Sequence, residues 1–581
     1  MPAIETWSAV AAQRHWFLCH PVWRKTLDFY TCPKDRRGEG PRTLRVRAPA
    51  LTLWSVFILS ACGSGEISEA GRSPYAGAAG SSSGAGGRGA ATTTGGVGGQ
   101  GGVAVAGSSG SGGEPIGNDG GGGSSGTGTG GGGSSGTAGG GDDVPVTCLR
   151  TVPVSTSANL GQAIASAKPG DCVVLADGTY TFPVIRAQGT ASSPIVIRAA
   201  NTTKATVTTG DLVLQGAAYV QVHGLTWSGS GTIHLTDCDH CRLSRSRVQR
   251  IDGDGEEWIT VDGASQSCRI DHNDLGPQSH TGNMIQLSGT DSQVVQYTRI
   301  DHNFFHDVHY TGGNGWECIR AGLSSYSFSS AHSIIEQNFF FHTANDPEVI
   351  SVKSSDNIVR YNTMRASAGQ FSLRHGNRTM LYGNYILGDG VGNSQGIRVC
   401  GSDHKLFNNY IQGVGSPAIY LEGGESTDTS GQLTDHKQVN RAMLLFNTIV
   451  NGEGIVVGGS HTRQPVDCTV AYNVLQGSGP LLSEASGTQN TTYLGNIVNG
   501  RTDITRGIIM ADPKLVKTGD VFSISIGSPA IDAATQPFSF VSDDIEGKPR
   551  ASPDDIGANE ISSAPGVFRL LSAADVGPMA P

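Results

Sequence analysis

Ile270-Asp-His-Asn273 and Ile300-Asp-His-Asn303 are two copies of one pattern, in which an apolar residue stands three positions before an asparagine. The pattern returns, once in a looser form, with its asparagines at Asn338, Asn362, Asn384, Asn409, Asn447, Asn473 and Asn496. A repeat of this length, built from short strands and polar turns, is typical of one coil of a parallel β-helix. We therefore predict an all-β fold of stacked coils, in which the asparagines form a ladder of side-chain amides.

A second repeated segment lies between the asparagines and carries an apolar residue in the middle of three. Its copies are Thr232-Ile-His234, Trp258-Ile-Thr260, Met284-Ile-Gln286, Cys318-Ile-Arg320, Ser351-Val-Lys353, Ser372-Leu-Arg374, Gly396-Ile-Arg398, Ala418-Ile-Tyr420 and Gly454-Ile-Val456. Neighbouring residues in a strand point to opposite faces, so the middle residue enters the core and the last residue faces outward. The last residues of the nine copies are then predicted to form one outward column.

Four cations would stand on consecutive coils of that column: Arg320, Lys353, Arg374 and Arg398. Stacked strands lie about 4.8 Å apart, so these like charges repel one another unless acids or an anionic ligand compensate them. The chain has a formal net charge of −10, which argues against nucleic acid as a partner. An anionic polymer bound along the column and a network of neighbouring acids are the two explanations that remain open.

Acidic residues stand just before the lysine of that column. Asp346 and Glu348 precede Lys353, and Asn314 and Glu317 come one coil earlier. Carboxylate and amide oxygens favour calcium over zinc. A structural calcium, or acids that only balance the cations, remain open. Glu348 and Lys353 are five residues apart, so both can serve one site only if the strand bends between them.

Two other patterns bear on metals and disulfides. His302, His306 and His309 are close in sequence and keep zinc or manganese open. Cys238-Asp-His-Cys241 is a weak zinc pattern, because no second pair of cysteines accompanies it. Cys148 and Cys172 are able to form one disulfide in an oxidising compartment.

The order of acids, lysine and arginine suits proton abstraction beside a bound metal. If a uronate occupies the groove, a neutral Lys353 removes the proton on C5 and calcium offsets the charge that develops on the carboxylate. Arg374 stabilises that charge or assists the departing O4, although a guanidinium is a poor acid. His375 or a tyrosine of the groove is the alternative proton donor. The reaction is then a β-elimination.

At four segments the chain resembles polysaccharide lyase family 6, which includes alginate lyases and chondroitinase B. The segments are Asn314-Gly-Trp-Glu-Cys-Ile-Arg320, Glu348-Val-Ile-Ser-Val-Lys-Ser354, Leu373-Arg-His-Gly376 and Gly396-Ile-Arg398. The resemblance covers roughly residue 154 to the early 500s and implies a single-stranded right-handed parallel β-helix. It also implies that Asn314, Asp346 and Glu348 bind Ca²⁺, that Lys353 is the catalytic base and that Arg374 is the acid. We expect Arg320, His375, Arg398 and Tyr420 to bind the substrate.

One residue departs from the family pattern. The family usually has glutamate where this chain has Asp346, which Pro347 follows. Because aspartate is one methylene shorter, we expect weaker or displaced calcium binding.

The N-terminal part has a different character. Residues 46–61 include a short apolar run after several arginines and end in small residues before Cys62, which resembles a bacterial lipoprotein signal. A buried apolar strand or helix beside an ordinary cysteine is the alternative. We expect a protein outside the cytoplasm, held at the outer membrane or cell surface by lipid on Cys62, or otherwise secreted. We assign no structure to residues 1–45, which would lie upstream of a normal signal and of the true start.

The remaining boundaries follow from composition. Residues 62–143 are nearly all Gly, Ser, Ala and Thr, which predicts a flexible linker. We expect the β-helix domain over residues 144–562, with a short capping α-helix over residues 159–168, and a loose tail over residues 563–581. We expect residues 511–560 to close the last coil.

The leading prediction is a calcium-dependent lyase that cleaves alginate. Cleavage of dermatan or chondroitin sulfate is the nearest alternative, since the chemistry at C5 is the same. A glycoside hydrolase would instead need two carboxylates across the sugar, which leaves the lysine and arginine without a role. A non-catalytic polysaccharide-binding β-helix is the alternative from another functional class.

Overall fold

The computed structural model describes residues 147–250 and 255–581, and only the backbone of residues 345 and 346. The chain divides into two units, residues 1–127 and 128–581, and every described residue belongs to the second unit. The predictions for residues 1–45, the signal segment 46–61, Cys62 and the linker 62–143 therefore lie outside the described residues. Among the described residues, no helix is both long and apolar enough to cross a membrane.

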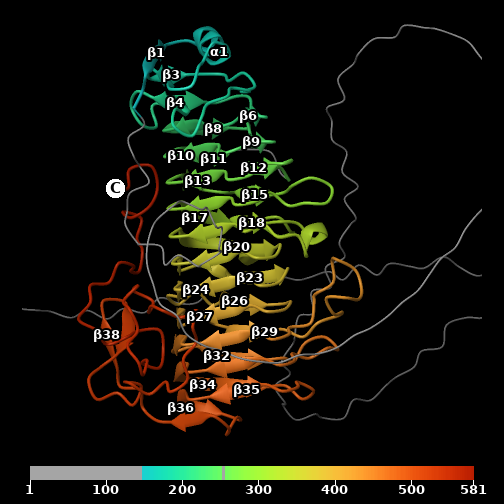
Figure 1. The fold of residues 1–581 in the computed structure, drawn as a ribbon, viewed down its shortest axis with the longest axis vertical. Helices are drawn as coiled ribbons and strands as arrows, with labels where there is room; N and C mark the ends of the chain where they lie inside the picture. The colour runs from blue at the N-terminus through green and yellow to red at the C-terminus, as the bar shows by residue number, and fades with distance from the viewer. Residues whose placement is uncertain (1–146, 251–254) are drawn as a thin grey trace, which may run out of the picture. The chain divides into compact units, whose positions relative to one another are not determined.

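Two parallel sheets form the body of this unit, and the coils stack one above another from the N-terminal helix to the last strands (Figure 1). The first sheet contains β1 (Arg150–Val154), β2 (Asp171–Leu175), β4 (Ile195–Ala199), β7 (Val220–His223), β10 (Arg242–Ser244), β13 (Arg269–Asp271), β16 (Arg299–Asp301), β19 (Ile334–Glu336), β21 (Ile358–Arg360), β24 (Met380–Tyr382), β27 (Lys405–Phe407), β30 (Met443–Leu445), β33 (Thr469–Ala471) and β35 (Thr492–Leu494). The prediction of an all-β parallel β-helix is confirmed.

The second sheet supplies two or more short strands to most coils. It contains β3 (Gly178–Thr179), β5 (Ala205–Val207), β6 (Leu212–Gln215), β8 (Leu225–Gly229), β9 (Ile233–Thr236), β11 (Arg247–Arg250), β12 (Ile259–Asp262), β14 (Asp274–Leu275), β15 (Ile285–Leu287), β17 (Phe304–His309), β18 (Ile319–Ala321), β20 (Phe339–Lys353), β22 (Thr363–Arg365), β23 (Ala368–His375), β25 (Tyr385–Leu387), β26 (Ser394–Val399), β28 (Tyr410–Gln412), β29 (Pro417–Leu421), β31 (Thr448–Val450), β32 (Glu453–Val457), β34 (Val474–Glu484), β36 (Asn496–Thr502) and β37 (Ile508–Met510). Between β18 and β19 lies one 3₁₀ turn, η1 (Ser324–Tyr326).

The short helix α1 (Ser157–Ala165) lies at the N-terminal end of the stack and packs against β1 and β2 (Figure 1). Thr156 caps it by accepting a hydrogen bond from the backbone N–H of Asn159. Leu160 and Ile164 are buried, as their helical spacing predicts, although the helix begins and ends earlier than residues 159–168. A disulfide between Cys148 and Cys172 joins the segment before β1 to β2.

The asparagine ladder is present and buried. From Asn273 to Asn496, the side-chain amide of each repeat asparagine donates to the side-chain oxygen of the next, over 2.8–3.0 Å. The same oxygen also accepts a hydrogen bond from a backbone N–H; for example, the N–H of Asn362 donates to Asn384 Oδ1 at 3.0 Å. The ladder satisfies polar groups in the turn between the two sheets and fixes the register of successive coils.

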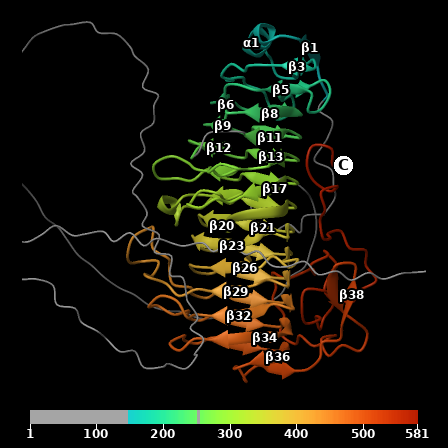
Figure 2. The same cartoon turned by 180° about the vertical axis from the view of Figure 1, so that it is seen from behind.

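The C-terminal segment runs back along the flank of the coils, where Figure 2 shows it in red beside β38. A hairpin of β38 (Leu515–Thr518) and β39 (Val521–Ile524) begins this part, and Val541 and Ile556 then pack against buried residues of β27, β30 and β33. The prediction that residues 511–560 close the last coil is therefore wrong, because their apolar side chains cover the side of the stack.

Residues 563–581 are packed as well. Phe568 stacks on Tyr361 with ring centroids 3.5 Å apart, and the backbone N–H of Leu571 donates to Thr363 Oγ1 at 3.0 Å. Gly577 donates to the backbone oxygen of His302 at 2.9 Å. These contacts hold residues 563–581 against the coils, where composition had predicted a loose tail.

Candidate active site

The outward column keeps its predicted facing but changes two members. Arg320 pairs with Ser351 of the next coil, and Ser372 pairs with Arg398. The observed column is His234, Thr260, Gln286, Arg320, Ser351, Ser372, Arg398, Tyr420 and Val456. The placement of Lys353 and Arg374 in this column is wrong by two residues. The facing pattern did not reveal the error, because a shift of two residues leaves every side chain on the same face of a strand.

Irregularities in β20 and β23 bring Lys353 and Arg374 back to the site. Glu348 pairs with Gln370 and Ile350 pairs with Phe371, so β20 holds one extra residue there. This bulge provides the bend that Glu348 and Lys353 need to face one side. Further along, Val352 pairs with Leu373 and Lys353 with His375, which leaves Arg374 as an extra residue of β23.

The carboxylate of Glu348 is the centre of the cluster. Its Oε2 accepts a hydrogen bond from Ser351 Oγ at 2.5 Å, and its Oε1 accepts one from Ser372 Oγ at 3.1 Å. Arg374 Nη1 and Arg398 Nη1 lie 3.3 and 3.4 Å from Oε1. Burial would raise the pKa of Glu348, but the charges of Arg374, Lys353 and Arg398 outweigh it and lower the pKa to about 2. Glu348 is therefore ionised at neutral pH.

Lys353 is buried beside two arginines and two acids. Its Nζ lies 3.9 Å from Glu317 Oε1, and 8% of the residue is exposed. Burial is the main cause that lowers the pKa of Lys353 from its usual value near 10.5; Glu317 opposes this effect, and Arg320 and Arg374 add to it. The amine thus loses its proton more easily than an exposed lysine does.

Glu317 holds the arginine on the preceding coil. Arg320 Nε and Nη2 donate to its two carboxylate oxygens at 3.0 and 2.9 Å, and Arg320 Nη1 donates to Gln286 Oε1 at 3.3 Å. Because the pair is buried and bidentate, it fixes the direction of the guanidinium.

Glu422 holds the arginine on the other side of the cluster. Arg398 Nε donates to Glu422 Oε2 at 2.7 Å, and Arg398 Nη2 lies 2.6 Å from the same oxygen. Burial would lower the pKa of Arg398, but Glu422 and Glu348 are among the groups that reverse this and raise it. Arg398 therefore joins two carboxylates, those of Glu422 and Glu348.

The charges of the cluster nearly balance. Four cations, Arg320, Lys353, Arg374 and Arg398, face three carboxylates, those of Glu317, Glu348 and Glu422, so one positive charge remains when all seven are ionised. Neighbouring acids thus compensate most of the column. A bound substrate carboxylate would balance part of the positive charge that these acids balance in its absence.

The structure does not place every predicted residue in the cluster. His375 is wholly buried and its Nε2 lies 3.2 Å from Ser324 Oγ; its contact with substrate stays a prediction. Burial, followed by the charges of Arg374 and Lys353, holds the pKa of His375 well below 6.5. Tyr420 is half-buried next to Arg398, and its pKa is raised, mainly by burial.

The predicted metal ligands differ in how far the structure describes them. Asn314 lies in an exposed turn, and the side chain of Asp346 is outside the described residues. Glu348 offers hard oxygens, and its 3.3–3.4 Å contacts with the two arginines are longer than the ~2.7–2.9 Å of a strong charge-assisted bond. In donor type these residues fit a calcium ion.

Glu422, His436 and His461 are site residues that the sequence analysis missed. His436 and His461 come from turns between β29 and β30 and between β32 and β33, whose variable lengths hide them from any repeat alignment. Ser351 and Ser372 were present in the aligned segments but were assigned no role.

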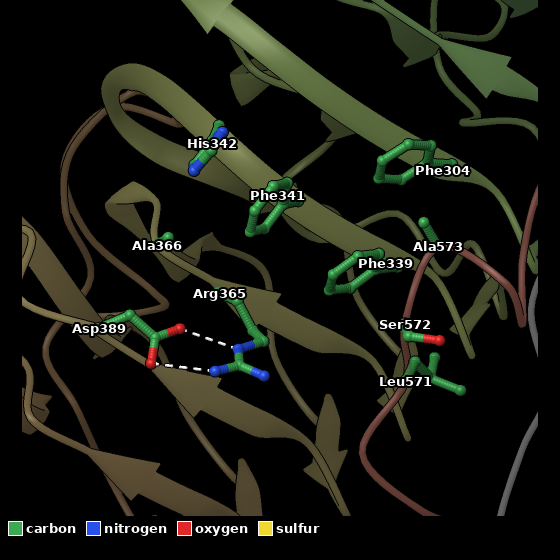
Figure 3. Close-up of a pocket in the computed structure, with 10 residues that line it drawn as sticks. All are labelled: Phe304, Phe339, Phe341, His342, Arg365, Ala366, Asp389, Leu571, Ser572 and Ala573. Carbon is green, nitrogen blue, oxygen red and sulfur yellow. Dashed lines mark hydrogen bonds and ion pairs between the residues drawn. The ribbon is translucent and has the colours of Figure 1, made fainter. Parts of the chain in front are cut away.

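A separate cavity of about 600 Å³ lies on the flank between β17, β20, β22 and the C-terminal segment. Figure 3 shows the rings of Phe304, Phe339 and Phe341 along one side of it and the Arg365–Asp389 pair on the other. None of the predicted catalytic, metal-binding or substrate-binding residues lines it, so we place the chemistry at the cluster around Glu348.

The fold and the cluster define a parallel β-helix protein with a buried group of paired cations and acids on the outward face of its coils. The family described as Chondroitinase B matches residues 154–474, and the chain belongs to that family. It is homologous to lyases of polysaccharide lyase family 6, which are enzymes. No curated protein matches the chain.

Solved structures of that lyase family are similar to this chain. The PL6 family alginate lyase AlyGC superposes with a TM-score of 0.58 at 26% identity, over 64% of this chain and 54% of AlyGC. A mannuronic acid specific family 6 lyase from human gut microbiota gives a TM-score of 0.52 at 26% identity, over 60% of this chain and 86% of that one. The alginate lyase AlyF-OU02, in a complex with G6, gives 0.56 at 21% identity, over 64% and 88%, and supports the fold alone. The chain thus spans about half the length of AlyGC.

Proposed function

We propose that this protein is a polysaccharide lyase that cleaves a uronate-containing polymer by β-elimination, with alginate as the leading substrate. The observation that carries the proposal is Lys353, a buried amine of lowered pKa within reach of Glu317 and among the charges of Glu348 and Arg374. The likeness to two family 6 lyases at 26% identity supports alginate as the polymer.

The proposed reaction begins with proton transfer to Lys353. The neutral amine removes the proton on C5 of the uronate, and the electrons of that C–H bond form the C4–C5 double bond as the C4–O4 bond breaks. Arg374 and Arg398 face the charge that develops on the sugar carboxylate, because both already point at the carboxylate of Glu348. O4 leaves with a proton.

The donor of that last proton is Tyr420 in this proposal. Its phenol keeps its proton at neutral pH, since burial raises its pKa, and it neighbours Arg398 in the outward column. His375 is the less suitable donor in this arrangement because its ring is buried. Arg374 binds its proton too strongly to serve as the acid.

We propose calcium as the metal, held by Glu348, Asn314 and Asp346. When bound, a calcium ion would neutralise part of the charge on the uronate carboxylate. The protein's own residues still bind the polymer and move the proton. The test is turnover after thorough chelation and after return of calcium; unchanged turnover without metal would remove calcium from the proposal.

An assay of the purified protein on alginate, dermatan sulfate and pectate tests the substrate. We expect ultraviolet absorbance from an unsaturated uronate with alginate and little with the other two polymers. Absorbance with dermatan sulfate alone would favour the glycosaminoglycan alternative. Binding without absorbance on any polymer would favour a non-catalytic polysaccharide-binding protein.

We also propose that the protein works outside the cytoplasm, attached to the membrane only through lipid on Cys62. The disulfide between Cys148 and Cys172 supports an oxidising compartment. Mass spectrometry of the N-terminal peptide from the native host tests this, since lipidation requires a diacylated Cys62 at the new N-terminus. An unmodified peptide extending before residue 62 would contradict it.

A further inference from the structure

Four side chains with metal-binding atoms lie close to Arg398 or to its partner Glu422. Cys400 follows β26, Glu422 follows β29, and His436 and His461 come from the two turns that follow on later coils. They thus come from four separate parts of the chain, and the fold alone brings them together. The proposed lyase reaction uses Glu422 only to hold Arg398 and gives the other three no role.

Cys400, Glu422 and His436 each offer a ligand atom within 4.8 Å of the other two, and His461 contacts Glu422 and His436. Atoms held about 2.0–2.3 Å from a tetrahedral zinc lie about 3.3–3.7 Å from one another. Here His436 Nδ1 and His461 Nε2 are 3.3 Å apart, and His461 Nε2 is 3.3 Å from Glu422 Oε1. His436 Nδ1 is 3.7 Å from Glu422 Oε2, and Cys400 Sγ is 3.0 Å from that oxygen.

The chemistry of the four groups selects a borderline metal. A thiol, a carboxylate and two imidazoles suit zinc, whereas calcium and magnesium prefer oxygen ligands alone. His436 Nδ1 and His461 Nε2 lie 3.3 Å apart, where one ring donates a hydrogen bond to the other, and an ion bound by both nitrogens would replace that hydrogen.

The cluster is reachable from outside. Cys400 is completely buried, whereas 14% of the His436 side chain and 25% of the His461 side chain are exposed. An ion would therefore enter past the two histidines. The second group of three candidate ligands in the described residues, His272, Asp301 and His302, lacks a thiol, and its rings stack on each other at 4.7 Å.

We propose that Cys400, Glu422, His436 and His461 form a binding site for a Zn²⁺-type ion, which competes with Arg398 for the carboxylate of Glu422. Zinc binding forms a bond to the Cys400 sulfur, and the thiol proton passes to the buffer. The competition follows from geometry, because Arg398 Nη2 lies 2.6 Å from Glu422 Oε2 and 3.3 Å from His436 Nδ1. An ion at the site would displace the guanidinium that also contacts Glu348, so it would inhibit the lyase; this consequence, unlike the binding, rests on the proposed function.

The direct test is titration of the metal-free full chain with Co²⁺ and Zn²⁺, without substrate. We expect tetrahedral cobalt absorption with a thiolate-to-cobalt band, displaced by one equivalent of Zn²⁺. Cys400→Ser should remove the thiolate band, and His461→Ala should weaken binding by about 100-fold or more. Cys468→Ser, a buried thiol elsewhere, and His302→Ala are the matched controls and should leave the spectrum unchanged. A thiolate band that persists in Cys400→Ser, or binding equal in parent and His461→Ala, would overturn the site.

The competition has its own test. Arg398→Ala frees Glu422 from a charged hydrogen bond, so zinc affinity should rise by about tenfold or more. Unchanged or weaker zinc affinity in Arg398→Ala would overturn the competition. If the calcium-loaded parent has lyase activity, zinc should inhibit it while sparing the residual activity of His461→Ala. Absence of lyase activity in the calcium-loaded, zinc-free parent would count against the proposed function and leave the cobalt result intact.

Discussion

Nζ of Lys353 lies 3.9 Å from Oε1 of Glu317, the same oxygen that receives a hydrogen bond from Arg320. One carboxylate thus connects the proposed base to an arginine on the preceding coil. Burial lowers the pKa of Lys353, and the negative charge of Glu317 opposes that effect.

The pH dependence of turnover should report this environment. Lys353 acts as a base only when neutral, so kcat/KM should rise with pH through its pKa and level off below the usual 10.5. Arg320→Met removes a cation and leaves Glu317 without its partner, and both changes raise the pKa of Lys353. The rising limb should then move to higher pH at fixed calcium, whereas Arg441→Met, which disrupts an exposed pair with Asp403, should leave it in place. A limb that moves to lower pH would contradict this account.

The asparagine ladder should carry a large share of local stability. Asn384 bonds to Asn362 and Asn409 and is wholly buried. Asn384→Ala leaves buried partners unsatisfied, so it should lower the free energy of unfolding by about 2–4 kcal/mol. Asn201→Ala, which removes an exposed bond to Asp177, should change it by less than about 0.5 kcal/mol. Equal denaturant midpoints for the two variants would argue against the ladder's role.

A buried ion pair on the first sheet should make stability depend on acid. Burial would raise the pKa of Asp301, but hydrogen bonds from His302 and Arg269 and the charges of Arg269 and Arg299 outweigh it and lower the pKa. The contribution of Asp301 is therefore complete above about pH 4, where the unfolded group is also ionised, and is lost as the pH falls further.

The Asp301→Asn variant tests that contribution. It should unfold about 3 kcal/mol more easily than the parent at pH 7, because Arg269 loses a buried partner. The difference should shrink as the pH falls below 4. Thermal unfolding at several pH values measures it, with Asp403→Asn, in an exposed pair, as the control that changes little. If the difference in stability between Asp301→Asn and the parent grew as the pH fell, the prediction would be contradicted.

The packed C-terminal segment should stabilise the coils that it covers. Phe568→Ala removes the ring that stacks on Tyr361 and should lower the free energy of unfolding by about 1–2 kcal/mol. Val567→Ala, at the exposed neighbour, is the control and should have little effect. If Phe568→Ala unfolds at the same denaturant concentration as the parent, the segment does not support the coils.

The sequence predicted the architecture because the asparagine of each coil needs the amide of the next. That one requirement, visible between Asn273 and Asn496, sets the coil and the facing of its strands. It does not set register within the outward column, since a shift of two residues keeps the facing. Lys353 and Arg374 were therefore aligned with Arg320 and Arg398, and the bulges that return them to the cluster left no repeat signal.

Residues outside the repeat were harder to predict. Glu422, His436 and His461 lie in or beside turns of irregular length, so no period relates them to Arg398. The packing of the C-terminal segment was not predicted for a different reason. Its apolar residues are sparse, but they pack against an apolar flank of the coils. The composition of the segment does not show that this flank exists.

The central claim is that Lys353 takes the proton from C5 of a uronate in the groove beside Glu348. The most direct measurement is the rise in ultraviolet absorbance when purified parent and Lys353→Ala are mixed with alginate, with polymer binding measured on the same samples. The account predicts a steady rise for the parent, none for Lys353→Ala, and binding retained by both. Turnover by Lys353→Ala at the rate of the parent would contradict it.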